Sequence, residues 1–564
     1  PLHTGGGIDS PRPASQRAAA LVLTAAMLTT FTAPAFAKTW YIEDGDITIS
    51  ASETKGTNKV SQGAEPEVED TGTIITNREK DASSHTVTIN AGNDKVEVTL
   101  DNVNIKADSG SALISKGDVT LTLKGDNHLT GGNGGSSSYG GDGITSSGSL
   151  TISGGTVTAT GGDSTSSVGS GGSGIYSVSG DVTISGGTVN ANGGDGKNGS
   201  GGGSGIDSSG GVTVSGGTVT ANGGDSKDGD GGSGGYGISS SGVAISGGTV
   251  TANGGDSKDG SGGNGIYSSG GVTISSGSTV TANGGDGEDG SGGRGITSNG
   301  GVTVSGGTVN AKGGSGKNGN GGDGIRSFNP VAISGGTVNA NGGNSDYSNG
   351  GDGIRSLDHV AISGGTVKSN GGSGNLSGGN GIISYDIDLS GSLELTAKAG
   401  SPNGKALSRV GSELDLNTIK DKLDPGAKVT ATDADGKVIQ QVSIPRPVEP
   451  EEPSSSSDSG SATPSAPASF LPGLTVTDKD GQRISYTSTQ SGNTLTVCVG
   501  RFTASLRISL AALRQLRAEG IETITFQTIL CSTTLSVDEL LAMGGEDAEA
   551  VLTHRLTDSS LTVG

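Results

Sequence analysis

Cysteine is nearly absent from this chain, and its two copies, Cys498 and Cys531, both lie near the C-terminus. Disulfides therefore do not hold together the rest of the sequence. Basic residues are also scarce: the chain has 35 Lys and Arg against 57 Asp and Glu, which gives a formal net charge of -22. This balance argues against partners such as nucleic acid or an anionic membrane, since both require Lys and Arg to neutralise phosphates.

Long apolar runs are missing except at the N-terminus, where "AAALVLTAAMLTTFTAPAFA" follows Arg12 and Arg17 and ends in Ala35-Phe36-Ala37. These features predict a secretory signal peptide, residues 1–37, cut before Lys38. A transmembrane anchor is the alternative, but the run is short and interrupted by Thr and Pro. We therefore expect a secreted or cell-surface protein with no membrane insertion after cleavage.

Glycine, in contrast, occupies 110 positions, against an ordinary share of about 7%. An ordinary globular core is excluded for most of the chain, yet apolar residues recur at intervals of about 30 residues. The recurring positions are Ile152, Ile184, Val214, Ile245, Ile274, Val304, Ile333 and Ile362. Such a period indicates a structural unit that buries its apolar face by stacking on its neighbours.

Each copy contains three short segments with strand character: a Gly-Ile segment such as "GIYSS", then "VTIS" or "VTVS", then "TVTA" or "TVNA". Val212 and Val214 point to one side, and Val219 and Ala221 continue that side after a Gly-Gly corner. The pattern predicts an all-β fold, a parallel β-helix (solenoid) of about 30 residues per coil, with like side chains stacked about 4.8 Å apart. We expect the solenoid over residues 38–400 and its C-terminal cap over 401–444.

Outward positions repeat as well. The asparagines at one such position are Asn192, Asn222, Asn253 and Asn283, followed by Asn341 and Asn370 after an interruption at Lys312. Amides stacked in this way pass hydrogen bonds from coil to coil, which needs no ligand. The glycine-rich tail of each copy varies in length, so we expect a long loop there, and loops are where function concentrates.

Two sets of aspartates recur in these tails. Asp195, Asp225, Asp256 and Asp286 follow the "NGG" of successive copies, and Asp228, Asp259 and Asp289 come three residues later. If the tails stack in register, facing carboxylates repel unless a cation neutralises them, and Ca²⁺ prefers such oxygen ligands. Lys227 and Lys258 compete for that role, and hydrated carboxylates that serve only solubility are the alternative.

The outward residue after each Gly-Ile pair changes along the chain: Tyr176, Asp207, Ser239, Tyr267, Thr297, Arg326 and Arg355. Arg326 and Arg355 are expected to be stacked neighbours, suited to clamp a uronate or another carboxylate, and Tyr176 and Tyr267 to stack on sugar rings. Because aromatics are only 3% of the chain and Asp323 and Asp352 lie three residues before the arginines, local charge pairing is the alternative.

Residues 85–132 include "VTLDNVNI", "ALI" and "VTLTLKGDN" followed by "LTGG". This succession resembles the clostridial cell-surface carbohydrate-binding β-helix family, and the later "SGGTV" repeats are similar to its tandem coils. The resemblance implies a right-handed β-helix like that of pectate lyases. It also implies calcium held by acidic clusters and attachment to plant-wall polysaccharides such as cellulose or polygalacturonate. An acidic protein on acidic pectin would need bridging cations.

No catalytic motif is present: His85, His128, His359 and His554 have no Ser, Cys or metal-spaced partner pattern. We therefore expect a carbohydrate-binding protein and no enzyme. A β-helix lyase or hydrolase, whose Asp, Lys and Arg would gather across coils, is one alternative. Another is a structural stalk or adhesin that binds a protein. The sequence does not indicate an oligomeric state.

After the repeats, residues 445–470 are rich in Pro, Ser and Glu and predict a linker. Residues 471–564 predict a small α+β domain. Its strands are "NTLTVCV" and "IETITFQTI", and its helices run from Ser509 to Leu516 and from the capping box at Ser536. Cys498 and Cys531 either pair with each other or stay free.

Overall fold

The computed structural model describes residues 37–135, 139–165, 169–227 and 231–445 of the repeat region. In the C-terminal region it describes 473–478, 482–484, 486–499, 503–528, 532–543, 548–554 and 559–563. The chain divides into two compact units, one ending at Glu449 and the other beginning at Pro450. Asp228, Cys531, residues 1–36 of the predicted signal peptide and nearly all of the predicted linker lie outside the described residues.

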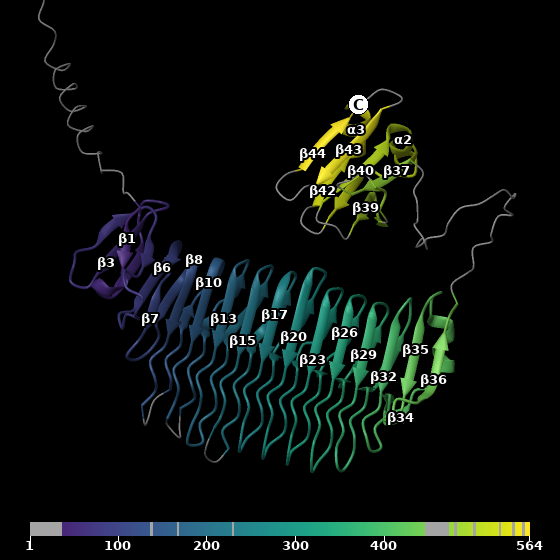
Figure 1. Cartoon of the computed structure of the whole chain (residues 1–564), viewed down its shortest axis with the longest axis horizontal. Coiled ribbons are helices and arrows are strands. Elements are labelled where there is room, and N and C mark those ends of the chain that lie inside the picture. The colour runs from purple at the N-terminus through teal and green to yellow at the C-terminus, as the bar shows by residue number, and fades with distance from the viewer. Residues whose placement is uncertain are drawn as a thin grey trace, which may run out of the picture. The chain divides into compact units, whose positions relative to one another are not determined.

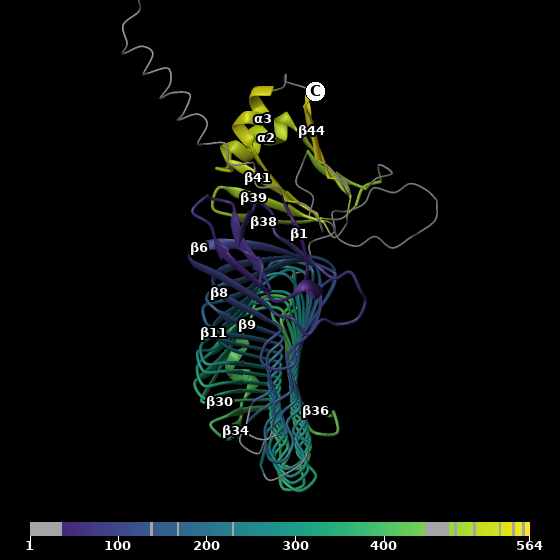
Figure 2. The ribbon, with the colours of Figure 1, turned by 90° about the vertical axis from the view of Figure 1, so that its left-hand side faces the viewer.

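The first unit is a parallel β-solenoid of about 13 turns with about 30 residues per coil, which confirms the predicted fold (Figures 1 and 2). A representative coil holds β18 (Ile266–Ser268), β19 (Val272–Ile274) and β20 (Ser278–Asn283). These strands pair in parallel with β21 (Ile296–Ser298), β22 (Val302–Val304) and β23 (Thr308–Lys312) of the next coil. The three predicted segments of each copy are therefore three strands.

Three columns of strands run along the solenoid. The first holds β9 (Ile144–Ser147), β11 (Ile175–Ser179), β14 (Ile206–Val214), β16 (Ile238–Ile245), β18, β21, β24 (Ile325–Ser327), β27 (Ile354–Ser356), β30 (Ile382–Ser384) and β33 (Leu407–Arg409). The second holds β10 (Leu150–Thr160), β12 (Val182–Ile184), the later parts of β14 and β16, β19, β22, β25 (Val331–Ile333), β28 (His359–Ile362) and β31 (Asp386–Leu389). The third holds the end of β10, β13 (Thr188–Asn192), β15 (Thr218–Asn222), β17 (Gly248–Asn253), β20, β23, β26 (Thr337–Asn341), β29 (Thr366–Asn370), β32 (Glu394–Lys398) and β35 (Lys428–Thr432).

The register places like residues on like residues, so the core is a set of aliphatic columns. Ile245 pairs with Ile274, Ile274 with Val304, and Val304 with Ile333, and all eight residues of this predicted column are at most 1% exposed. β-branched side chains suit this arrangement because their stiff rotamers pack well on a pleated surface. A long, thin apolar core results, to which each coil contributes a few side chains.

The glycine-rich tails are not loose loops. They form two arms in each coil, which we call the glycine arms. The two arms of one coil are joined by backbone hydrogen bonds such as Gly293 N to Gly285 O, and successive coils by bonds such as Gly314 N to Gly293 O, both 2.8 Å long. A Cβ on Gly322 would lie 1.8 Å from the carbonyl oxygen of Gly293. Glycine is required because backbone packs directly on backbone. The arms are the unarrowed stacked traces below the strands in Figure 1.

Antiparallel strands close both ends of the solenoid. At the N-terminal end β2 (Ile47–Ala51), β3 (Asn58–Gln62) and β4 (Val68–Asp70) pair in antiparallel fashion, while β1 (Thr39–Tyr41) pairs with β5 (Ile74–Thr76) in parallel. The next coils use β6 (Val87–Asp101), β7 (Asn104–Lys106) and β8 (Leu113–Thr130). At the other end β36 (Val438–Ser443) pairs with the edge of β35, which protects the last strand from pairing with another chain.

The described residues of the second unit form two four-stranded sheets and two helices. One sheet holds β37 (Leu474–Thr477), β40 (Ala504–Ser509), β43 (Glu549–His554) and β44 (Ser559–Val563); the other holds β38 (Thr487–Ser491), β39 (Thr494–Cys498), β41 (Thr523–Gln527) and β42 (Ser532–Ser536). Helices α2 (Leu510–Ala518) and α3 (Val537–Met543) follow β40 and β42. Ser509, the first residue of the predicted helix, lies one residue before α2 and caps it by accepting the Ala512 N–H at 3.2 Å. Cys498 carries a free thiol, and burial raises its pKa.

Candidate functional site

The solvent side of the first strand column carries the residues that change most from coil to coil. We call this surface the Gly-Ile face. The register confirms that Tyr176 pairs with Asp207, Asp207 with Ser239, Ser239 with Tyr267, Tyr267 with Thr297, Thr297 with Arg326, and Arg326 with Arg355. A second column lies just before the Gly-Ile pairs and includes Asp142, Tyr236, Asn264, Arg294, Asp323, Asp352 and Asn380. The two columns together form one continuous surface.

An aromatic pair lies near the middle of the Gly-Ile face. The rings of Tyr236 and Tyr267 stack with centroids 5.4 Å apart and an interplanar angle of 17°. Burial is the main cause that raises the pKa of Tyr236, and the neighbouring Tyr267 adds to it. Tyr176 is three strand pairings away from Tyr267, so the two tyrosines named from the sequence do not meet. The stacking partner is Tyr236, one position before a Gly-Ile pair.

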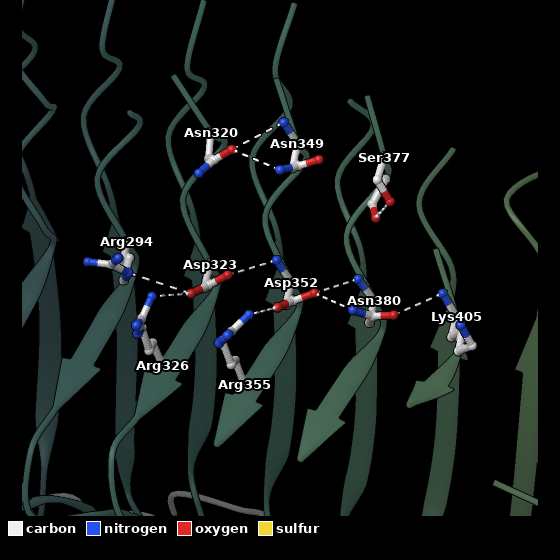
Figure 3. A network of polar contacts seen from close by, with 11 residues as sticks. Arg294, Asn320, Asp323, Arg326, Asn349, Asp352, Arg355, Ser377, Asn380 and Lys405 are labelled. Carbon is white, nitrogen blue, oxygen red and sulfur yellow. Dashed lines mark hydrogen bonds and ion pairs between the residues drawn. The ribbon is translucent and has the colours of Figure 1, made fainter. Parts of the chain in front are cut away.

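Three arginines gather on the C-terminal side of the tyrosines (Figure 3). Arg294 Nε and Arg326 Nη1 lie 3.5 and 3.6 Å from the same oxygen, Oδ2 of Asp323. Arg355 Nη1 lies 3.1 Å from Oδ2 of Asp352. The predicted charge pairing within each coil is therefore confirmed, and Arg294 joins it from the preceding coil.

The aspartates of this cluster are held by the backbone. Oδ1 of Asp323 accepts the Asp352 N–H at 2.9 Å, and Oδ1 of Asp352 accepts the Asn380 N–H at 2.6 Å (Figure 3). Asn380 continues the row by accepting the Lys405 N–H at 3.0 Å. Because one oxygen of each carboxylate is committed to the next coil, only the other oxygen is available to the arginines.

The arginine cluster has an excess of positive charge, because three guanidinium groups face two carboxylates. Burial lowers the pKa of Arg326, and the charge of Arg294 lowers it further. Burial and the neighbouring Asp323 raise the pKa of Asp352, which weakens its negative charge. Nε of Arg326, Nε of Arg355 and Oγ1 of Thr297 are buried with no hydrogen-bond partner in the structure. Unused donors of this kind are rare in folded proteins and call for an explanation.

The N-terminal part of the Gly-Ile face has the opposite character. Burial raises the pKa of Asp142 and of Asp207. Thr145 donates to Asp142 Oδ2 at 2.6 Å, and Asp142 Oδ1 accepts the Ser173 N–H at 2.8 Å. The Gly-Ile face thus changes from acidic groups, through tyrosines, to arginines along the solenoid.

The first predicted aspartate row lies on the glycine arms. Oδ1 of Asp195 accepts the Asp225 N–H at 2.9 Å, Oδ1 of Asp225 accepts the Asp256 N–H at 3.0 Å, and Oδ1 of Asp256 accepts the Asp286 N–H at 2.7 Å. These carboxylates therefore stand in single file, each linked to the next coil. Lys227 forms an ion pair with Asp195, as the sequence suggested for one competing cation.

Calcium binding at this row stays a prediction, and the surroundings of the row carry charges of both signs. A depression of about 460 Å³ is lined by five carboxylates and three lysines: Asp225, Asp256, Asp286, Glu288 and Asp346, with Lys227, Lys258 and Lys317. Asp259 and Asp289 do not line it, and Asp289 instead accepts the Asn318 amide at 2.6 Å. Within the described ranges no three His, Cys, Asp or Glu side chains gather closely enough to hold a metal ion. Lysines and further carboxylates both accompany the aspartates of this row.

The asparagine column has a structural role, as predicted. Asn222 donates to Asn192 at 2.9 Å, and the bonds from Asn253 to Asn222 and from Asn283 to Asn253 are both 2.8 Å. The column stops at Lys312, which pairs with Asn283 and Asn341, and resumes with Asn370 donating to Asn341 at 2.7 Å. These amides form hydrogen bonds with each other, so the column serves the contacts between coils and not ligand binding.

Four segments of the chain, residues 150–174, 182–204, 243–265 and 331–354, match the Beta helix repeat family. The chain therefore contains β-helix repeats, in agreement with its solenoid fold. No curated protein and no solved structure matches the chain. In the part of the chain that the structure describes, no helix has the length and apolar character needed to cross a membrane. The β-helix part of the predicted family resemblance is supported, while carbohydrate binding stays a prediction.

Two residues of the candidate site were missed from the sequence, namely Tyr236 and Arg294. Both immediately precede the glycine of a Gly-Ile pair, in the position that Asp323 and Asp352 occupy in later coils. A column drawn through this position would have shown the change from Asp142 to Tyr236 to Arg294. The signal was present, but it lay in the glycine-rich tails, which have no strand alternation to mark it.

Proposed function

We propose that the Gly-Ile face binds a polysaccharide that carries carboxylate groups, and that the protein does so after export. The observation that carries the proposal is the stacked pair Tyr236–Tyr267 beside a cluster of three arginines with only two carboxylates. Aromatic faces offer an apolar platform for a sugar ring. A guanidinium offers paired donors for a carboxylate, so the two features together suit an acidic sugar.

The charge distribution supports a local anion site. The whole chain has a formal charge of -22, so an acidic polymer is repelled by most of the surface and is admitted only where arginines are in excess. The repulsion falls with ionic strength, while partly buried arginines are screened less. Direct contact with arginines makes a bridging cation unnecessary, so this proposal does not depend on the predicted calcium.

A structural stalk or adhesin is the second candidate. The glycine arms, the asparagine column and the aliphatic columns all serve coil-to-coil contacts, so most of the repeated residues contribute to length and stiffness. Such a protein would bind its partner through a few coils or through the C-terminal unit. Binding of a glycan that is lost when residues of the Gly-Ile face are substituted would favour the first candidate over the stalk or adhesin.

The test is retention of residues 38–564 on polygalacturonate, cellulose and neutral polysaccharides, once with calcium and once with a chelator. The proposal predicts retention on the acidic polymer in both conditions. Retention only with calcium would instead favour the acidic row on the glycine arms. Retention on no polysaccharide would favour the stalk.

A further inference from the structure

A fully buried carboxylate lies in the N-terminal cap. Asp70, the last residue of β4, has no exposed surface. Its Oδ1 accepts the backbone N–H of Lys38 at 3.0 Å and that of Gly72 at 3.2 Å, and its Oδ2 accepts the Trp40 indole N–H at 2.8 Å. No Lys, Arg or His side chain among the described residues forms an ion pair with it. All three of its donors are neutral in the intact chain, although an ionised carboxylate away from water requires a counter-charge.

The backbone nitrogen of Lys38 becomes an amine if the signal peptide is cleaved at the predicted position. The signal-peptide motif Ala35-Phe36-Ala37 places the cut between Ala37 and Lys38. Hydrolysis adds a hydroxyl from water to the Ala37 carbonyl carbon and leaves the Lys38 nitrogen as an amine. An α-amino group has a pKa of about 8, so the nitrogen is a cation at neutral pH. The nitrogen that gains the charge is the one already 3.0 Å from Asp70 Oδ1.

We propose that Lys38 is the mature N-terminus and that its α-ammonium group forms an ion pair with the buried carboxylate of Asp70. The pair fastens β1, which is held to β5 by only three residue pairs, Thr39 with Ile74, Trp40 with Ile75 and Tyr41 with Thr76. Solenoids depend on closed terminal coils, so processing supplies a charge that closes the first coil. The lysine side chain is not needed for this contact, because its Nζ lies over the Trp40 ring, 3.7 Å from the centroid.

Trp40 provides a direct readout. It is the only tryptophan of the chain, it is 3% exposed, and its indole donates to the same carboxylate. Its fluorescence therefore reports the opening of the N-terminal cap separately from the rest of the solenoid. Hydrogen exchange of the β1 amides reports the same event.

The first experiment determines the N-terminal residue of protein exported from a bacterial host, by intact mass and N-terminal sequencing. The proposal predicts Lys38 as the first residue. An unprocessed chain, or any other first residue, overturns it.

The second experiment compares two purified chains that both end at residue 564, one beginning at Lys38 and one beginning at Ala35. Both keep the Lys38 N–H and Asp70, but only the first has a charge at that nitrogen. We expect the β1 amides to exchange about tenfold more slowly in the first chain, and the Trp40 transition to occur at a higher temperature. Equal exchange rates in the two chains overturn the proposal.

Asp70→Asn, made in both chains, shows whether the charge of Asp70 is responsible. The substitution keeps an acceptor for Trp40, and we expect it to remove the difference between the chains. Asp81→Asn, at an exposed position outside this contact, is the matched control and should leave the difference intact. A difference that survives Asp70→Asn overturns the ion pair.

Discussion

Tyr236 and Tyr267 lie on neighbouring coils and in different columns of the Gly-Ile face, yet their rings stack with centroids 5.4 Å apart. The register pairs Ile238 with Ile266. Tyr236 comes just before the first of these Gly-Ile pairs and Tyr267 just after the second, so the pairing brings the two rings together. Two single tyrosines thereby become one aromatic platform. Arg326 follows Tyr267 on the same face after two strand pairings, and this arrangement gives the solenoid a candidate ligand surface.

Tyr267→Ala is expected to weaken binding of an acidic oligosaccharide about tenfold, or about 1.4 kcal/mol, because half of the aromatic platform is lost. Titration calorimetry measures the change. Tyr347→Ala is the control, since Tyr347 lies on a glycine arm and is 61% exposed. Equal losses in the two variants would show that the platform does not contact the glycan.

Lys312→Asn is expected to stabilise the solenoid. The new amide would stand between Asn283 and Asn341, with which position 312 pairs, and would join the two parts of the asparagine column through two hydrogen bonds. Each such bond contributes about 0.5–1.5 kcal/mol. Chemical denaturation measures the free energy of unfolding, and Lys312→Ala, which removes the same charge without supplying an amide, is the control. A gain that is equal in both variants would assign the effect to charge alone.

Gly293→Ala is expected to destabilise the glycine arms by about 1–3 kcal/mol, because the added methyl group forces packed backbone apart. Its Cβ would lie 1.8 Å from the carbonyl oxygen of Gly263. Gly242→Ala is the matched control, since the nearest atom there is 3.9 Å away. Thermal unfolding of both variants tests this, and similar stabilities would mean that the arms are not tightly packed in solution.

Asp256→Asn is expected to stabilise the protein at pH 7. Burial, followed by the charges of Asp286 and Asp225, raises the pKa of Asp256, so its ionised form disfavours the folded state. Stability linked to this group is therefore present in acid and is lost as the pH rises through its folded pKa. The amide keeps an acceptor for the Asp286 N–H and removes the charge.

The gain from Asp256→Asn should stay below about 1 kcal/mol at pH 7, because the stacked arms remove only part of the hydration of the carboxyl group and solvent still screens it. It should vanish near pH 3, where the carboxyl of the parent protein is protonated. Thermal melting at the two pH values measures both effects. A loss of stability at pH 7 would indicate that the ionised carboxylate holds a cation.

The core and the strand columns could be predicted from the sequence because two repeats mark the same residues, the alternation within each strand and the recurrence from coil to coil. Alternation within "VTIS" marks the inward residues, and the recurrence of about 30 residues marks the stack, so Ile245 and Ile274 were correctly placed in one column. The pairing of Arg326 and Arg355 followed from the same register. Side chains on strands are predictable in this fold because each coil repeats the geometry of the last.

The glycine arms were not readable in the same way. Glycine has no side chain to show which way a residue faces, so a packed backbone stack and a loose loop have the same composition. Hydrogen bonds such as Gly322 N to Gly314 O join residues of different arms and appear only in the folded chain. For the same reason Tyr236 and Arg294, which end these tails, were missed.

The most direct test of the acidic-glycan surface compares binding of residues 38–564 to polygalacturonate with binding to the same polymer after methyl esterification. The two polymers share a backbone and differ in the negative charge of the carboxylate. Arginine recognition predicts clear binding of the charged polymer, weaker binding of the ester, and loss of this preference in Arg326→Gln combined with Arg355→Gln. Equal binding of both polymers, or a preference that the double variant keeps, would contradict it.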